Sequence, residues 1–238
     1  MSRRGRRVFP LIALGGALVF GELLREVLGH TGLTRTLDPW LASAIATRRV
    51  GWLAMVFSIL TWLGSAFFLV PLGVAVAAWL WMWQHRLRPA ILLAIAVGGA
   101  AGLYDIVKPL VHRLRPEAAL QYGGPDEGWA FPSGHATQSA SFYAMLVVVL
   151  SAYAWPRRHV MLAVAAATIV LVIAASRLYL GVHWLTDVVG GLALGLTWFA
   201  IVMVTAAFID RRRSATAGGS SAPAGRSPDR RSGRTAPG

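Results

Sequence analysis

The sequence lacks cysteine entirely, contains a single lysine and has few charged residues of either sign. Without cysteine, the protein forms neither disulfide bonds nor thiolate metal sites. Charged residues make up 14% of the 238 residues and hydrophobic residues 56%, whereas a soluble globular domain carries about 25% charged residues. This balance excludes an ordinary soluble domain and indicates an integral membrane protein.

Long apolar runs dominate the chain instead. A run of about 20 apolar residues is enough to cross a bilayer as a helix. The predicted fold class is therefore an all-α integral membrane protein, a six-helix bundle that forms one domain over residues 1–210. The six expected transmembrane helices are Val8–Leu28, Gly51–Trp83, Pro89–Val107, His135–Trp155, Val160–Ser176 and Val182–Ile209.

The segments around these runs have their own patterns. The second run is longer than a bilayer requires, and Gly64, Ser65 and Pro71 interrupt it. Either a short interfacial helix leads into the span, or the whole run forms one tilted helix. Upstream, Asp38–Arg49 has the apolar spacing of an amphipathic surface helix. Residues 211–238 are rich in Arg, Ser, Gly, Pro and Ala and predict a disordered, basic C-terminal tail.

The formal net charge of +13 comes largely from residues that flank the apolar runs. Four arginines precede the first run without a clear cleavage site after it, so we expect a retained signal-anchor helix. Six spans place both termini on one side, together with eleven arginines at the N-terminus and in residues 84–88, 156–159 and 210–213. The positive-inside rule then predicts a multi-pass plasma (inner) membrane protein with cytoplasmic termini. Because membrane anchoring explains the charge, we expect no nucleic-acid partner.

Three short polar segments interrupt the apolar sequence. They are Lys108–Pro116, Pro132–His135 and Ser176–Asp187, and the predicted topology places all three on the extracytoplasmic face. Charged groups in an apolar setting are costly and usually serve a function. Cations bind phosphate oxygens, and histidines act as nucleophiles or as acids and bases. The segments therefore predict a phosphate-handling site on that face.

The third segment pairs a histidine with a carboxylate. His183 and Asp187 are four residues apart, so on a helix they share a face. An aspartate bound to one ring nitrogen leaves the other nitrogen free as a nucleophile. Gly181 separates Arg177 from His183, and we expect a turn there between two helices. The alternative is that the histidine and the aspartate only cap a helix end.

The other two segments supply anion-binding groups. Ser133 is a preferred N-cap residue, and Gly134 lets backbone amides approach a ligand closely. Amides at a helix N-terminus bind anions, and His135 would stand beside them. Lys108 and Arg115 follow the third span and offer two cations to phosphate. The alternatives are an ordinary N-cap and a basic loop that flanks the membrane.

Together the segments match the signature K-x6-RP, PSGH and SR-x5-H-x3-D, and the sequence resembles the type 2 phosphatidic acid phosphatase (lipid phosphate phosphatase) family. The resemblance covers residues 108–187 directly and extends to about 8–209 through the six predicted spans. The matching positions are Lys108, Arg115, Pro116, Pro132, Ser133, Gly134, His135, Ser176, Arg177, His183 and Asp187.

The resemblance implies a membrane phosphatase that acts on a lipid phosphate or pyrophosphate, of the undecaprenyl pyrophosphate or phosphatidic acid class. It implies that His183 is the nucleophile, that Asp187 orients it, and that His135 protonates the leaving group and then activates water. It implies neither a metal nor another cofactor, and the expected partners are the lipid phosphate substrate and membrane lipids. The implied phosphate-binding residues are Lys108, Arg115, Ser133, Gly134 and Arg177.

Alternatives remain open at this stage. A phosphotransferase would pass the phosphoryl group to a lipid or sugar hydroxyl, and a transporter would bind lipid phosphates without chemistry. A zinc site from the histidines and Asp187 is disfavoured because the neighbouring cations would repel a metal. We expect His112 and Arg113 to be solvated. The loop 117–131 could act as a flexible lid, but we favour the alternative that its acidic residues, Asp126 included, are simply solvated. The oligomeric state is not predicted.

Overall fold

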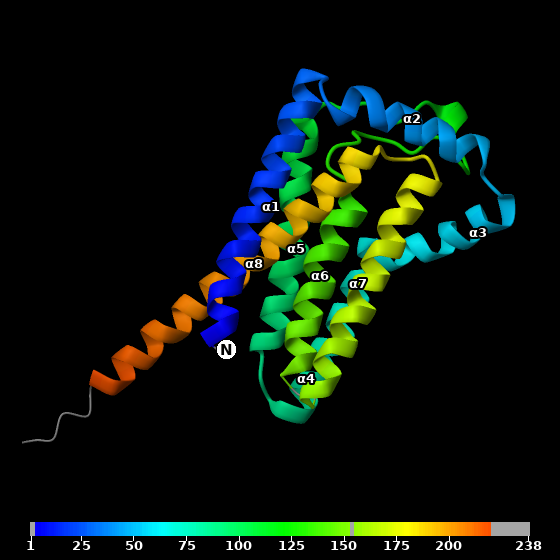
Figure 1. The fold of residues 1–238 in the computed structure, drawn as a ribbon. Helices are drawn as coiled ribbons and strands as arrows, with labels where there is room; N and C mark the ends of the chain where they lie inside the picture. Colours follow the sequence, from blue (N-terminus) through cyan, green and yellow to red (C-terminus); the bar gives the residue numbers. More distant parts are fainter. Residues whose placement is uncertain (1–2, 153–154, 220–238) are drawn as a thin grey trace, which may run out of the picture.

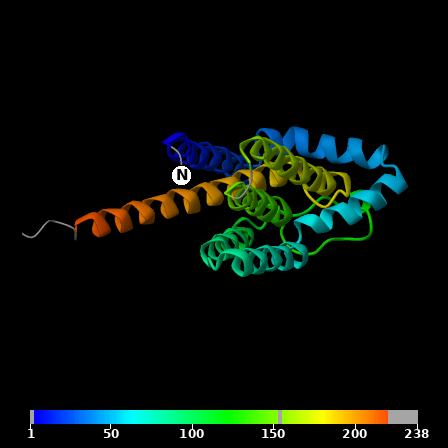
Figure 2. The same ribbon diagram turned by 90° about the horizontal axis from the view of Figure 1, so that it is seen from below.

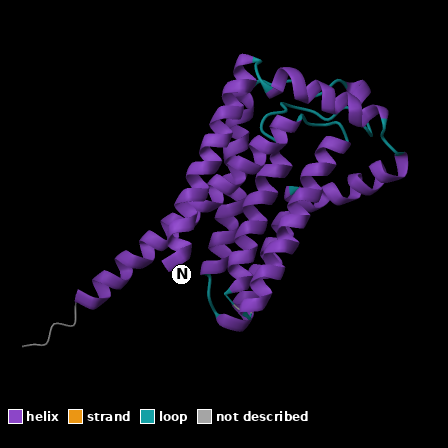
Figure 3. Cartoon of the chain, viewed as in Figure 1, coloured by secondary structure: helices purple, strands orange, loops and turns teal. Residues whose placement is uncertain are grey.

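Helices are the only regular elements in residues 3–152 and 155–219, the part of the chain that the computed structural model describes (Figure 3). Eight are α-helices, and two short 3-10 helices complete the set. In chain order they are α1 (Arg3–Gly29), α2 (Leu33–Thr47), α3 (Gly51–Leu60), η1 (Thr61–Gly64), α4 (Ala66–Gln84), α5 (Arg88–Val111), η2 (Ala118–Leu120), α6 (Gly134–Ser151), α7 (Pro156–Tyr179) and α8 (Leu185–Gly219).

The segment between α1 and α4 covers one end of the bundle. Figure 1 shows α2 lying across that end and α3 returning obliquely toward the long helices. The axis of α2 makes an angle of 119° with that of Gly51–Gly64. The chain breaks again at Ser65, whose extended backbone separates η1 from α4. The predicted amphipathic helix is present but runs from Leu33 to Thr47 instead of Asp38–Arg49, and the run from residue 51 begins with a short helix that leads into a candidate span.

Helix α6 lies at the centre of the bundle, packed against α5, α7 and α8 (Figures 1 and 2). Its N-terminal half is polar and buried, and its side chains bond to neighbouring helices. Ser141 Oγ donates to the carbonyl oxygen of Ala96 at 3.0 Å, and Gln138 Nε2 donates to the Tyr104 hydroxyl at 3.1 Å. On α8, a Cβ at Gly195 would collide with backbone of α6. The small residue lets these two helices approach closely.

Hydropathy identifies several candidate membrane spans but does not by itself establish their number. Within residues 3–152 and 155–219, five helices are long and apolar enough to cross a membrane, namely α1, α4, α5, α7 and α8, and α2 taken with Gly51–Gly64 would count as a sixth by composition. Helix α6 falls outside this set because its first half is polar, and that half is shielded by neighbouring helices rather than by lipid. The protein is therefore multi-pass, while the assignment of α6 as the sixth span stays a prediction.

The last helix is longer than the sequence indicated. Helix α8 begins at Leu185, three residues after the expected start, and continues to Gly219. Residues 211–219 are thus helical, and the expectation of a disordered tail from residue 211 was wrong for this stretch. The rest of the predicted tail, 220–238, lies outside the described residues.

The two ends of the bundle differ in what they carry. Figure 1 shows the N-terminus and the far end of α8 pointing away from the end that α2 covers. Exposed tryptophans lie at both ends: Trp83 is 75% and Trp155 78% exposed at the α4 and α7 ends remote from α2, and Trp40 on α2 is 64% and Trp52 on α3 65% exposed. Aromatic residues of this kind favour a membrane interface. All three polar segments lie at the end near α2.

Candidate active site

His183 lies in the turn between α7 and α8, and Asp187 lies in the first turn of α8. The imidazole Nδ1 is 3.4 Å from Asp187 Oδ2, and both side chains are buried. An ionised carboxylate only accepts hydrogen bonds, so Nδ1 carries the ring proton and Nε2 keeps its lone pair. The contact predicted from the four-residue spacing is present, although His183 precedes the helix instead of sharing a helical face.

The local backbone holds this pair in place. The Trp184 amide donates to Asp187 Oδ2 at 2.8 Å, which is one arm of a capping box at the start of α8. The chain turns at Gly181, where φ is 72° and where a Cβ would collide with the carbonyl oxygen of Leu120. Only glycine fits that position without strain. The turn predicted at Gly181 is confirmed.

Two guanidinium groups converge beside His183. Arg115 Nη1 lies 3.3 Å from His183 Nε2 and 3.0 Å from Asp126 Oδ2. Arg177 Nη2 lies 2.8 Å from the same carboxylate oxygen. The arginine side chains are 9% and 8% exposed. The expectation that Asp126 is simply solvated was wrong, because its carboxylate joins the two cations that the sequence assigned to phosphate.

The start of α6 faces the same region. Ser133 is its N-cap, and the Ser133 amide donates to the carbonyl oxygen of Asp187 at 3.0 Å. The first helical bond comes from the Thr137 amide to the carbonyl oxygen of Ser133, so the amides of Gly134 and His135 have no partner within the helix. These two amides, rather than that of Ser133, have the position of an anion-binding helix terminus.

Buried polar atoms without a hydrogen-bond partner in the described structure include Ser133 Oγ and Arg177 Nε, near the histidines. Ser133 is fully buried and Arg177 is 7% exposed. Since buried polar groups are almost always paired, both atoms are donors available to an oxyanion. Arg177 also borders a cavity of about 430 Å³ that His135 and Asp126 help to line.

Lys108 stands in the last turn of α5 and is half-buried. Its Nζ lies 5.3 Å from the centroid of the Tyr104 ring and within electrostatic range of Arg115 and Arg177. The structure thus gathers every residue that the sequence assigned to the site at one end of the bundle. They are Lys108, Arg115, Ser133, Gly134, His135, Arg177, His183 and Asp187.

The electrostatic surroundings favour a neutral His183. Burial, together with the positive charges of Arg177, Arg115 and Lys108, lowers the pKa of His183 well below its usual value of 6.5. The carboxylate of Asp126 acts in the opposite direction but more weakly. A neutral imidazole with a free Nε2 is the form that attacks an electrophile.

Comparison with known proteins identifies the family. The sequence model of the PAP2 superfamily matches residues 89–211, more than half of the chain. The chain belongs to the PAP2 superfamily. Phosphatidylglycerophosphatase B of Bacillus subtilis (strain 168) is 30% identical to it over 175 residues, which cover 73% of this chain and 85% of the relative.

Two solved structures have a similar fold. The crystal structure of a transmembrane PAP2 type phosphatidylglycerolphosphate phosphatase from Bacillus subtilis is 28% identical, with a TM-score of 0.77 over 84% of this chain and 98% of that one. The structure of Aquifex aeolicus LpxE is 23% identical, with a TM-score of 0.54 over 71% of this chain and 95% of that one. The second likeness concerns the fold alone.

A buried ion-pair network lies behind the PAP2 signature and was missed from the sequence. Arg113, expected to be solvated, is 11% exposed and bonds to Asp187 Oδ1 at 2.5 Å and to Asp38 Oδ2 at 2.6 Å. Asp38, on α2, is 1% exposed. In the sequence, Asp38 is distinguished only as a single acidic residue beside an apolar stripe. His112, expected to be solvated, is exposed, and its ring lies edge-on to that of Trp129 with centroids 4.6 Å apart.

The hypothesis of a zinc site finds no geometric support among the described residues. No group of three or more His, Asp or Glu side chains in residues 3–152 and 155–219 is arranged to hold a metal ion. The His112 ring contacts Trp129, and Arg115 lies against the Nε2 of His183.

Proposed function

We propose that the protein hydrolyses the phosphate of a membrane lipid phosphate through a covalent phosphohistidine at His183. The coarser activity, that of a membrane lipid phosphatase, follows from PAP2 membership and from the likeness to phosphatidylglycerophosphatase B. One observation carries the finer proposal. Arg115 Nη1 lies 3.3 Å from the unprotonated Nε2 of His183, and Arg115 and Arg177 together hold an oxyanion, the carboxylate of Asp126.

The proposed reaction has two steps. In the first, Nε2 of His183 attacks phosphorus, the bond from phosphorus to the lipid oxygen breaks, and His135 donates a proton to that oxygen. In the second, water attacks the phosphohistidine, its proton passes to His135, and inorganic phosphate leaves with Nε2 restored as a free base. Asp187 stabilises the imidazole as charge develops on it.

The equatorial phosphate oxygens need donors that are in place before the reaction begins. Arg115 Nη1 and Arg177 Nη2 already bind an oxyanion, and Arg177 Nε and Ser133 Oγ are unpaired. Lys108 and the Gly134 amide complete the proposed set. Substrate would displace Asp126, since its carboxylate contacts the same guanidinium groups. Fixed cations of this kind stabilise phosphoryl transfer as metal ions do elsewhere, so we propose a reaction without a metal cofactor.

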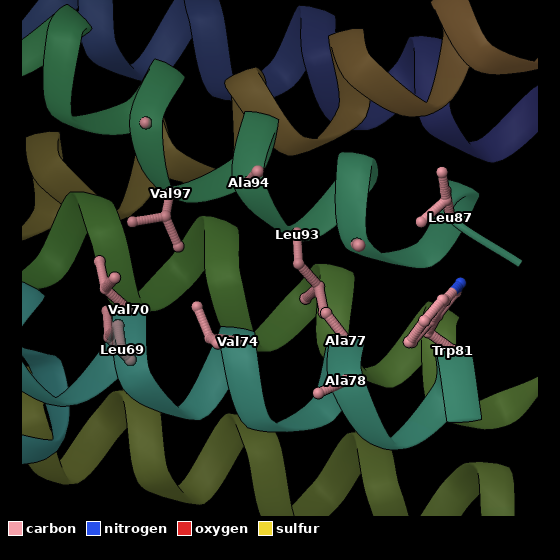
Figure 4. Close-up of a pocket in the computed structure, with 13 residues that line it drawn as sticks. Leu69, Val70, Val74, Ala77, Ala78, Trp81, Leu87, Leu93, Ala94 and Val97 are labelled. Carbon is pink, nitrogen blue, oxygen red and sulfur yellow. The ribbon is translucent and has the colours of Figure 1, made fainter. Parts of the chain in front are cut away.

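The leading substrate is phosphatidylglycerol phosphate, because both Bacillus subtilis relatives are named for it. Phosphatidate and undecaprenyl pyrophosphate are the alternatives. An apolar groove of about 570 Å³ between α4 and α5 suits an acyl chain (Figure 4). It extends from Leu69, one turn beyond the Ser65 that borders the site cavity, to Trp81 at the other end of α4.

We place the site on the extracytoplasmic face of the plasma membrane, with α6 as the sixth span and both termini cytoplasmic. One feature supports this orientation. The arginines of residues 84–88 and 210–213 lie at the end of the bundle opposite the site (Figure 1). Arginine-rich segments that flank membrane spans usually lie on the cytoplasmic side.

Phosphate release by purified protein in detergent tests the function. The panel comprises phosphatidylglycerol phosphate, phosphatidate and undecaprenyl pyrophosphate, each with and without EDTA. We expect release to be fastest from phosphatidylglycerol phosphate, to be insensitive to EDTA and to vanish in His183→Ala. Wild-type activity in His183→Ala would overturn the mechanism, and transfer of label to an added alcohol without free phosphate would make the protein a phosphotransferase.

A further inference from the structure

Helix α2 contributes a buried carboxylate to the site from outside the matched family region. Asp38 Oδ2 lies 2.6 Å from Arg113 Nη2, and Arg113 Nη1 lies 2.5 Å from Asp187 Oδ1. Asp187 in turn contacts the Nδ1 of His183 through its other oxygen. The Arg113 guanidinium therefore links Asp38 to Asp187, and Asp187 contacts His183. None of these contacts involves His183 Nε2, the atom proposed to attack the substrate.

The surroundings of Arg113 exclude water from these contacts. Asp38 is 1% and Asp187 0% exposed, and the indole of Trp184 lies with its ring centroid 5.7 Å from the guanidinium carbon of Arg113. The Trp184 indole N–H donates to the carbonyl oxygen of Leu114 at 2.9 Å, which fixes that ring. In such a setting a buried ion pair is strongly coupled, and removal of one partner leaves the other uncompensated.

The geometry also restricts the position of the Asp187 carboxylate. Arg113 has two terminal nitrogens in one rigid plane, and each binds a different carboxylate. Asp38 sets the orientation of the guanidinium together with the Thr186 hydroxyl, which accepts a hydrogen bond from Arg113 Nη1 at 2.6 Å, and the guanidinium sets the position of Asp187 Oδ1. Because Asp187 Oδ2 meets the imidazole, a rotation of this carboxylate would move the acceptor away from Nδ1.

We propose that Asp38 and Arg113 are positioning residues that hold Asp187, and through it the imidazole of His183, in the geometry of phosphoryl transfer. This inference rests on the proposed function, since it assigns the pair to the same nucleophile. It makes α2 part of the reaction's machinery, although α2 contributes no residue to the PAP2 signature.

A structural role competes with this proposal and must be separated from it. Asp38 Oδ1 accepts a hydrogen bond from the Thr186 amide at 3.1 Å, and Oδ2 accepts one from the Thr186 hydroxyl at 2.6 Å. Asp38 thus caps the N-terminus of α8. Asp38→Asn keeps an oxygen for the Thr186 amide but removes the charge opposite Arg113, so it tests the ion pair and spares much of the cap.

Glu26 offers a matched control. Its Oε2 accepts a hydrogen bond from the Leu33 amide at 2.9 Å and so caps the N-terminus of α2, but it has no contact with Arg113 or Asp187. Glu26→Gln makes the same carboxylate-to-amide change at a helix N-terminus away from the site. Arg113→Lys is the second test variant, since it keeps a positive charge between the two carboxylates and loses the planar fork.

The experiment measures kcat, KM and thermal unfolding of full-length purified protein in detergent, with phosphatidylglycerol phosphate as substrate. We expect Asp38→Asn and Arg113→Lys to lower kcat by about 10- to 100-fold, the range typical of residues that orient a reacting group from behind. We expect KM to change less than about twofold, since neither residue touches substrate. Glu26→Gln should keep wild-type kcat even if its unfolding temperature falls.

The possible outcomes separate a failure of the positioning role from a failure of the proposed function on which it rests. If His183→Ala is inactive while both Asp38→Asn and Arg113→Lys keep wild-type kcat, the positioning role is wrong and the function stands. If kcat falls only in proportion to the loss of folded protein, as judged against Glu26→Gln, the pair is structural and the inference is overturned. If His183→Ala retains activity, the proposed function itself fails.

Discussion

Asp126 Oδ2 lies 2.8 Å from Arg177 Nη2, in the position that the proposed mechanism assigns to a phosphate oxygen. The same oxygen lies 3.0 Å from Arg115 Nη1. The substrate-free protein thus satisfies its two buried guanidinium groups with a carboxylate of its own. Any phosphate that enters must replace this carboxylate, and the cost of that exchange is measurable.

Asp126→Asn is expected to tighten the binding of anions. Its side chain is 36% exposed, and an ion pair with that much solvent contact is worth about 1 kcal/mol or less. The inhibition constant for inorganic phosphate should therefore fall by up to about fivefold, and KM for the lipid substrate should fall with it. Glu127→Gln, a change in the neighbouring exposed acid, is the control. An increase in both constants would mean that Asp126 arranges the arginines for substrate.

The pH dependence of kcat/KM tests the electrostatics of His183. Burial and the nearby cations Arg177, Arg115 and Lys108 lower its pKa below 6.5, so the imidazole stays neutral as the pH falls to that value. Activity should persist above the lowered pKa and be lost as the pH falls through it. Because Asp126 raises the pKa of His183, Asp126→Asn should move the acid limb to lower pH. Both enzymes share one substrate, so its own ionisation cancels, and a shift to higher pH would contradict the assignment.

The groove between α4 and α5 predicts selectivity for long acyl chains. Val74→Trp should fill part of the groove shown in Figure 4 and lower kcat/KM several-fold for a long-chain diacyl substrate. It should leave unchanged the hydrolysis of a short-chain, water-soluble analogue. Val164→Trp, at a 59% exposed position on α7 outside this groove, is the control. Equal losses on both substrates would show that the groove does not receive the chain.

The orientation in the membrane is testable because the protein has no cysteine of its own. Glu127→Cys places a thiol on the loop beside the site, and Arg86→Cys places one on the connection between α4 and α5 at the opposite end. A membrane-impermeant maleimide applied to intact cells should label the first and not the second until the membrane is opened. The reverse pattern would put the site on the cytoplasmic face.

The sequence predicts the site best where its residues are close together along the chain. The contact of His183 with Asp187 and the turn at Gly181 depend on spacings of a few residues, and local geometry determines them. The family signature then assigns Lys108, Arg115 and the rest to one site. The helix ends are less predictable, because hydropathy averages over many residues while the start of α8 depends on one capping bond from Trp184 to Asp187.

Contacts between distant segments were not predictable. Asp38 and Arg113 are 75 residues apart, and neither belongs to a repeat or to a periodic pattern that would reveal a pairing. Asp126 lies in a loop where an acid is usually solvated, so only the fold reveals that it meets Arg177. Hydropathy alone leaves α6 outside the candidate spans, because its buried polar half lowers the average over the helix.

The placement of α2 and η1 has a consequence for how small the protein can be made. A fragment cut to residues 89–211 would keep every signature position. It would nevertheless lose Asp38, leaving Arg113 with one carboxylate partner fewer, and Thr61, whose hydroxyl accepts a hydrogen bond from Arg177 Nη1 at 3.2 Å. Such a fragment would contain the whole motif and lack the contacts that keep its arginines in position. The shortest working enzyme is therefore defined by the helices that close over the motif, and it must begin ahead of α2.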